Sequence, residues 1–214
     1  MRTFDNNVVS IVGMPCSDLE FSHEVFGEGF YNLKLRIPRL SEHVDILPIT
    51  ISERLLVDFE VKEEKLIRIE GQLRSYNKII NGNNRLILTI FAREISEEQE
   101  ENVSNPNQIF LDGFVCKEPV YRTTPFGREI TDMLVAVNRP YRKSDYIPCI
   151  AWGRNARYSE KMKIGDRIKI WGRIQSREYQ KKIDEETVVK KTAYEVSISK
   201  MDVMPEENNR TDVD

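Results

Sequence analysis

The stretch that decides the fold is Ile168-Lys-Ile-Trp-Gly-Arg-Ile-Gln-Ser-Arg-Glu-Tyr179. Apolar and polar side chains alternate along it, which is typical of a β-strand buried on one face. Tyr146-Ile-Pro-Cys-Ile-Ala-Trp152 predicts a second strand, and Val135-Ala-Val137 predicts a third. One short helix fits between strands at residues 155–163, and Thr124-Pro-Phe-Gly127 predicts a hairpin turn. This order of strands, helix and strands predicts a small antiparallel barrel, the five-stranded OB-fold.

The same unit occurs twice in the chain. At an offset of 100 residues, identical residue types recur at Gly13 and Gly113, Cys16 and Cys116, Phe26-Gly27 and Phe126-Gly127, Arg39 and Arg139, Asp45 and Asp145, Pro48 and Pro148, and Arg54 and Arg154. After one inserted residue, the offset becomes 101 and the matches continue with Ile67, Ile69, Gly71 and Ser75 against Ile168, Ile170, Gly172 and Ser176. A repeat that keeps its register in this way indicates two copies of one fold. The sequence therefore predicts an all-β protein of two tandem OB-fold barrels, with one short helix per repeat.

A polar, acidic segment divides the two copies. Residues 1–95 form the first copy, which contains the strong hairpin signal Asn81-Gly82. Residues 96–107 are rich in glutamate and interrupted by Pro106, so we expect an acidic linker there. Residues 108–204 form the second copy, and residues 205–214 are expected to be a short, disordered acidic tail.

The formal net charge of −3 hides an asymmetry between the copies. Residues 1–104 carry 12 basic and 18 acidic side chains, and residues 202–214 carry one basic and five acidic side chains. Residues 105–201 carry 19 basic and 12 acidic side chains. A basic module between acidic neighbours indicates a polyanionic partner for the second copy. The alternative from charge alone is a scattered, solvated surface.

Several classes of protein are excluded by what the sequence lacks. No apolar run reaches the roughly 20 residues that cross a bilayer, and the first residues lack the apolar core of a secretory signal. We expect isolated Cys16, Cys116 and Cys149 to be free thiols in a reducing cytoplasm. The cysteines and the two histidines do not have the spacing of a zinc site, and there is no glycine-rich phosphate loop. We therefore expect no catalytic residue, no metal, no cofactor and no enzymatic activity.

The two faces of the predicted strands have different roles. Ile147, Cys149 and Ala151 stay apolar in the first copy, whereas the face that holds Tyr146 and Trp152 becomes partly polar there. We therefore expect Tyr146 and Trp152 on the outside of the second barrel. On residues 168–179, the face opposite the isoleucines alternates cations and rings, namely Lys169, Trp171, Arg173, Arg177 and Tyr179.

Such a surface suits single-stranded nucleic acid, because bases stack on aromatic rings while cations follow the phosphates. The alternative is a packed interface with the other copy or with another subunit. That alternative is most open for Trp171, which a domain interface would accommodate.

The second copy resembles the bacterial single-stranded DNA-binding proteins over nearly its whole length. The matching stretches are Ile109-Phe-Leu-Asp-Gly-Phe114, Thr124-Pro-Phe-Gly127, Leu134-Val-Ala-Val-Asn-Arg-Pro-Tyr141, Asp145-Tyr-Ile-Pro-Cys-Ile-Ala-Trp-Gly153 and Gly165-Asp-Arg-Ile-Lys-Ile-Trp-Gly-Arg-Ile-Gln-Ser-Arg-Glu-Tyr179. The resemblance implies an OB-fold that stacks bases on Tyr141, Tyr146, Trp152 and Tyr179, and the alternation along residues 168–179 adds Trp171 as a further candidate. The nearby candidates for phosphate contacts are Arg139, Arg142, Lys143, Arg154, Arg173 and Arg177.

The chain departs from that family in two places. At the stacking positions, the first copy has Ser41, Ile46, Ser52 and Lys78. We expect it to bind DNA weakly or not at all by that mode, and to pair barrels or dock a partner instead. The family's acidic tail usually ends in Pro-Phe, which recruits replication proteins, whereas this chain ends in Asp-Val-Asp.

The leading hypothesis is sequence-tolerant binding of single-stranded DNA in replication, recombination or repair, by a cytoplasmic, nucleoid-associated bacterial protein. The family usually assembles four OB-folds, so a chain with two is expected to form a homodimer, with replication or repair proteins as possible partners and no membrane. One alternative is an OB-fold adaptor for protein interactions, such as a primosome-like or mobile-element accessory factor. Another is binding of single-stranded RNA.

Overall fold

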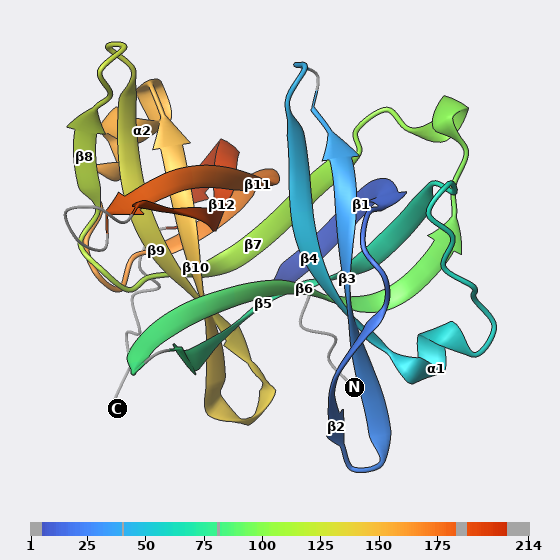
Figure 1. Cartoon of the computed structure of the whole chain (residues 1–214). Helices are drawn as coiled ribbons and strands as arrows, with labels where there is room; N and C mark the ends of the chain where they lie inside the picture. Colours follow the sequence, from blue (N-terminus) through green and yellow to red (C-terminus); the bar gives the residue numbers. More distant parts are fainter. Residues whose placement is uncertain (1–5, 40, 81, 183–187, 205–214) are drawn as a thin grey trace, which may run out of the picture.

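The computed structural model describes residues 6–39, 41–80, 82–182 and 188–204, which form two similar halves (Figure 1). The first half contains β1 (Asn7–Pro15), β2 (Glu20–Val25), β3 (Glu28–Pro38), β4 (Val44–Ser52), α1 (Glu53–Leu56), β5 (Ile67–Ile80) and β6 (Asn83–Glu97). The second half contains β7 (Asn107–Val115), β8 (Val120–Thr123), β9 (Glu129–Arg139), β10 (Lys143–Trp152), α2 (Arg154–Ser159), β11 (Arg167–Lys182) and β12 (Val188–Val203). Single turns of 3-10 helix lie at Glu100–Asn102 and Pro140–Arg142.

Each half closes on itself as a five-stranded barrel. In the first half, β1 pairs with β3 and β5, β3 with β4, β4 with β6, and β6 with β5. The second half repeats this order with β7, β9, β10, β12 and β11, and in both halves the third and fifth barrel strands run parallel. The short helix follows the third barrel strand in each copy. The prediction of two tandem OB-folds is confirmed.

The matched glycines of the repeat lie where strands come too close for a side chain. A Cβ atom on Gly71 would lie 2.3 Å from the carbonyl oxygen of Phe91, and one on Gly172 would lie 2.2 Å from that of Ser197. Both glycines mark an irregularity in the pairing of the two longest strands of their barrel. A bulge increases the local twist, which lets a long strand bend around a small barrel.

The two barrels are joined by their first strands. β1 and β7 pair antiparallel, from Asn7 opposite Leu111 to Ile11 opposite Asn107, so one sheet continues through both halves. The buried amides of Asn7 and Asn107 fix the start of each strand in the same way. Each donates from Nδ2 to a backbone carbonyl of its own barrel and accepts the N–H of the same residue, Leu73 for Asn7 and Ile174 for Asn107.

Two buried carboxylates tie each barrel to the other. The backbone N–H of Ser176 donates to Asp45 Oδ1 across 2.7 Å, and the N–H of Ser75 donates to Asp145 Oδ1 across 2.7 Å. The β3–β4 hairpin of the first half thus docks on β11, and the β9–β10 hairpin of the second half docks on β5. The identities that revealed the repeat at Asp45, Asp145, Ser75 and Ser176 belong to this exchange of hairpins.

Some predicted boundaries differ from the structure. The helix expected at residues 155–163 is α2, which begins at Arg154 and already ends at Ser159. The hairpin turn at residues 124–127 is confirmed, since the N–H of Gly127 donates to the carbonyl of Thr124 at 2.8 Å. The linker expected at residues 96–107 is shorter at both ends, because β6 continues to Glu97 and β7 begins at Asn107. The expected tail, residues 205–214, lies outside the described residues.

Candidate nucleic-acid interface

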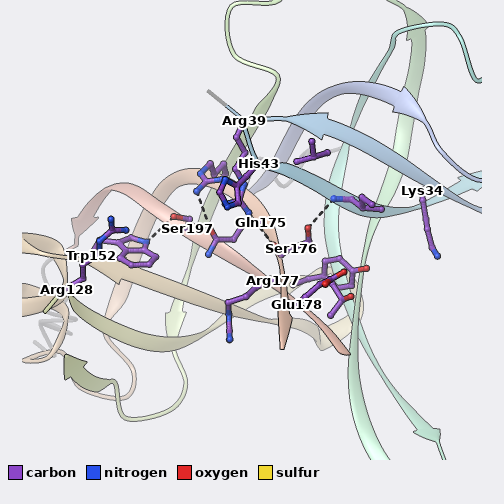
Figure 2. A pocket seen from close by; sticks show the side chains of 15 residues that line it. Lys34, Arg39, His43, Arg128, Trp152, Gln175, Ser176, Arg177, Glu178 and Ser197 are labelled. Atoms are coloured by element: carbon purple, nitrogen blue, oxygen red, sulfur yellow. Dashed lines mark hydrogen bonds between the residues drawn. The ribbon is translucent and has the colours of Figure 1, made fainter. Parts of the chain in front are cut away.

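A groove of about 860 Å³ runs along the outer face of the second barrel. It lies over β10, β11 and β12, and the first half supplies its opposite rim from β3, β4 and the hairpin between them. Figure 2 shows Trp152 beside Arg128 on one side, with Arg39 and His43 across the groove. The lining residues are Lys34, Arg39, His43, Val44, Ile46, Arg128, Trp152, Arg173, Gln175, Ser176, Arg177, Glu178, Thr192, Tyr194 and Ser197.

Trp152 is the aromatic anchor of this groove. Ile147, Cys149 and Ala151 are buried in the barrel, so the expected inward face of β10 is confirmed. Trp152 therefore projects outward, and its ring is half-buried. Its Nε1–H donates to Ser197 Oγ on β12 at 3.1 Å. The hydrogen bond holds the ring at the floor of the groove and leaves aromatic surface available for stacking.

Positive charge lines the groove that holds the ring. Five lining residues are Lys or Arg, two of them from the first half, against one carboxylate at Glu178. Burial is the main cause that lowers the pKa of Arg173, with Arg39 acting in the same direction and Asp45 opposing. An arginine starts so far above neutrality that it stays charged under such a shift. The groove is therefore a cationic channel with an aromatic floor.

Two of the predicted phosphate contacts already hold the hairpin exchange together. Arg173 Nη1 lies 3.4 Å from Asp45 Oδ2, and Arg139 Nε lies 3.2 Å from Asp145 Oδ2. Arg39, which was not among the predicted contacts, makes a bidentate pair with Asp45 at 2.8 and 2.6 Å and also lines the groove. This hydrogen bonding is the main cause that raises the pKa of Arg39.

The predicted stackers do not all lie together. Tyr146 is six residues from Trp152 along β10, which at about 3.3 Å per residue places it roughly 20 Å away. Its backbone N–H donates to Ser75 Oγ of the first half at 2.7 Å, so Tyr146 lies at the other barrel. Tyr141 is 93% exposed at the tip of the same hairpin, next to exposed Arg142 and Lys143.

Tyr141 and Arg142 both have left-handed backbone, with φ values of 63° and 56°. Such a conformation is uncommon for residues other than glycine, asparagine and aspartate, and it directs the Tyr141 ring away from the hairpin into solvent. The tip therefore presents an aromatic side chain that nothing in the described part of the chain covers.

Tyr179, Arg154 and Trp171 lie outside the groove lining. Tyr179 is 38% exposed on β11, and the guanidinium carbon of Arg177 lies 5.9 Å from its ring centroid. Arg154 is exposed at the start of α2. Trp171 packs against Phe110 of β7 with ring centroids 5.1 Å apart, and Lys200 Nζ lies 4.5 Å over its ring. The structure therefore separates Trp171 from Trp152.

Comparison with known proteins identifies the second half. Residues 106–204 match the model of the single-strand binding protein family. The single-stranded DNA-binding protein of Oceanobacillus iheyensis is 35% identical over 81 residues, which are 35% of this chain and 50% of that protein. The chain thus spans about half the length of the curated relatives it matches.

The solved structures extend the likeness in fold to both halves. The single-stranded DNA binding protein from Thermus aquaticus superposes with a TM-score of 0.72 over 92% of both chains, at 17% identity. The N-terminal domain of PriB protein from Thermoanaerobacter tencongensis is 51% identical over 45% of this chain and all of its own, with a TM-score of 0.40. The Thermus structure shows that the likeness in fold covers both barrels together.

Neither a metal site nor a membrane helix was found in the described part of the chain. No group of three or more His, Cys, Asp or Glu side chains there could hold a metal ion. No described helix is long and apolar enough to cross a bilayer. The groove cations that were not predicted from the sequence are Arg128 of the second half and Lys34 and Arg39, which the first half contributes. The only sequence signal for Arg39 was its match to Arg139 in the repeat.

Proposed function

We propose that this chain binds single-stranded DNA without sequence preference, in the groove around Trp152. The observation that carries the proposal is an indole ring fixed on an outer barrel face, in a groove lined by cations from both halves. Bases would stack on the ring, at about 1–3 kcal/mol per base, and the cations would neutralise the phosphates. Binding of this kind needs no bond to be made or broken, and its place would be in replication, recombination or repair.

Titration of the whole protein into labelled poly-dT of about 35 nucleotides, followed by fluorescence anisotropy, tests the proposal. We expect tight binding at low salt, with log affinity falling against log salt at a slope of about −0.7 per phosphate contacted. Absence of binding at low salt would overturn the proposal and leave the aromatic face as a protein interface. Tighter binding of poly-U in a competition would replace DNA with RNA as the ligand.

Substitution of Trp152 tests the anchor itself. Trp152→Ala should weaken binding to the oligonucleotide about 10-fold or more, because a stacking surface is lost. Trp152→Phe keeps a ring and should retain most of the affinity. Tyr158→Ala removes an exposed aromatic residue from α2, outside the groove, and serves as the matched control. Equal affinities of the two alanine variants would contradict the role of Trp152.

We infer that the chain assembles as a homodimer with four OB-folds. The inference rests on the resemblance of the second half and on the two barrels present in each chain. Sedimentation equilibrium of the free protein should give twice the chain mass of 25.1 kDa, to which bound DNA adds its own mass. A mass of 25.1 kDa at the concentrations that bind DNA would show that two barrels suffice.

A further inference from the structure

We propose that the first barrel carries its own site for the bases of a single strand, with Phe91 as the stacking ring. The proposal rests on the proposed function and extends it to the half that departs from the family at the stacking positions. It is carried by a second groove, of about 600 Å³, on the outer face of the first barrel. The lining residues are Ser22, His23, Thr50, Arg74, Ser75, Tyr76, Lys78, Thr89, Phe91 and Arg139.

The outward-facing aromatic ring lies on different strands in the two barrels. In the second barrel, Ile150 of β10 pairs with Ser197 of β12, and Ser197 holds the Trp152 ring. In the first barrel, Thr50 of β4 pairs with Phe91 of β6, so Phe91 occupies the place of Ser197. Ser52 occupies the place of Trp152. A serine and a large ring have exchanged strands, and an aromatic residue still lies on the outer face.

A similar exchange has occurred along the long strand of each barrel. Ser75 of β5 corresponds to Ser176 of β11, so Tyr76 corresponds to Arg177 and Lys78 to Tyr179. The second barrel has the cation first and the ring second, whereas the first barrel has the ring first and the cation second. A comparison position by position therefore shows only that Lys78 replaces the tyrosine. It overlooks Tyr76, which is 50% exposed and lies two residues away.

The surroundings of Phe91 suit a base. Its ring is half-buried against Phe30, with centroids 5.7 Å apart, and the guanidinium carbon of Arg74 lies 6.0 Å from its centroid. The ring of His23 stacks on Phe30, with centroids 5.0 Å apart and an interplanar angle of 13°. Bases stack on aromatic rings and phosphates pair with cations. This groove has both kinds of side chain.

This groove is lined by positive charge, although the first barrel as a whole is acidic. Residues 1–104 have six more acidic than basic side chains. None of the described residues that line this groove carries a carboxylate, whereas Arg74, Lys78 and Arg139 do line it. Buried Asp145 lies 3.5 Å from Arg74 and 3.2 Å from Arg139 and offsets one of these charges, which leaves a positive excess for phosphates.

The second barrel completes this groove as the first completes the other. Arg139 reaches it from the β9–β10 hairpin, whose backbone at Tyr146 donates to Ser75 in the lining. Neither Arg139 Nε nor Asp145 Oδ2 has a hydrogen-bond partner in the described chain, because their 3.2 Å contact is poorly aligned. Arg39 and Asp45 are fully paired at the equivalent place. Arg139 therefore contributes positive charge to this groove, while its Nε stays buried against Asp145.

Calorimetric titration of the full-length protein with a dT oligomer of about eight nucleotides tests the proposal, since an OB-fold covers about 4–16 nucleotides. We expect two oligomers per chain for the wild type and one per chain for both Phe91→Ala and Trp152→Ala. Phe21→Ala, an exposed phenylalanine of the same barrel outside the groove lining, is the matched control and should keep two.

Further variants guard against loss of folding. Phe91→Leu fills the space beside Phe30 without a ring, and Tyr76→Ala changes an exposed side chain. Phe91→Leu should lose the second oligomer, and Tyr76→Ala should weaken its binding about 10-fold, while circular dichroism and thermal unfolding stay as in the wild type. This proposal would be overturned if the wild type bound one oligomer, Trp152→Ala abolished that binding and Phe91→Leu did not change it. The proposed function would still stand after that result. Absence of any binding by the wild type would overturn the proposed function.

Discussion

At the scale of single residues, the environment of each thiol separates three cysteines that look alike in the sequence. Cys149 is 2% exposed in the second barrel, and burial strongly raises the pKa of its thiol. Cys116 is half-buried and Cys16 is exposed, and partial burial also raises the pKa of each. A raised pKa keeps a thiol protonated at neutral pH and lowers its reactivity, since the thiolate is the nucleophile.

We predict that Cys149 does not react with a disulfide reagent in the native protein at pH 8, whereas Cys16 does. The reaction of Cys16 should accelerate as the pH rises, because its thiolate fraction increases. Counting the thiols released before and after unfolding in guanidinium chloride checks both statements. Native reaction of all three cysteines at one rate would contradict the burial of Cys149, and Cys16→Ser identifies the fast thiol.

At the scale of elements, two exchanged hairpins set the geometry of both grooves. The β3–β4 hairpin brings Arg39 to the groove of the second barrel, and the β9–β10 hairpin brings Arg139 to that of the first. Figure 1 shows the β9–β10 hairpin passing alongside β5. Asp45 and Asp145 hold these hairpins through backbone N–H groups, so each site depends on a carboxylate of the opposite barrel.

We predict that Asp145→Ala lowers the free energy of unfolding by about 3 kcal/mol, because it leaves the buried N–H of Ser75 without its acceptor and two arginines without their counter-ion. Urea denaturation measures the change. Asp132→Ala removes the same group from an exposed pair with Arg122 and should cost less than about 1 kcal/mol. Equal costs for the two variants would show that the exchanged hairpin does not depend on Asp145.

At the scale of the whole molecule, the pairing of β1 with β7 fixes both barrels in one sheet. The two grooves therefore cannot move apart as they would on a flexible linker. The β9–β10 strand pair runs from Trp152 in one groove to Tyr146 at the other barrel, with Tyr141 at its tip. Under the proposed function, single-stranded DNA that leaves one groove would meet these exposed aromatic side chains on its way to the second.

We predict that the stoichiometry depends on the length of the oligonucleotide. An oligomer of about eight nucleotides should bind twice per chain, whereas one of about 30 nucleotides should bind once and more tightly, because its second contact is intramolecular. Calorimetry across a series of lengths measures both quantities. Tyr141→Ala should reduce the gain in affinity for the long oligomer and leave the short one unaffected. A stoichiometry that is independent of length would contradict two linked grooves.

The fold could be predicted because its signals are local or repeated. Alternation along residues 168–179 reports which face is buried, and Ile168, Ile170 and Ile174 are indeed buried. The recurrence of glycine at positions 71 and 172 indicates a place where two backbones approach closely in each barrel. The outward direction of Trp152 was predictable for the same reason, since neighbouring residues of a strand point to opposite faces.

The sequence by itself thus determined two OB-folds, their order and the outer faces that hold Tyr146 and Trp152. Only the tertiary structure decided which residues share a groove, because each groove combines side chains from strands of both barrels. It placed Lys34 in the lining of the groove that holds the ring of the other barrel, tied Arg139 and Arg173 to buried carboxylates, and set Phe91 in the place of Ser197. These relations depend on pairing between strands that are distant in the chain, and the alternation within a strand contains no information about that pairing.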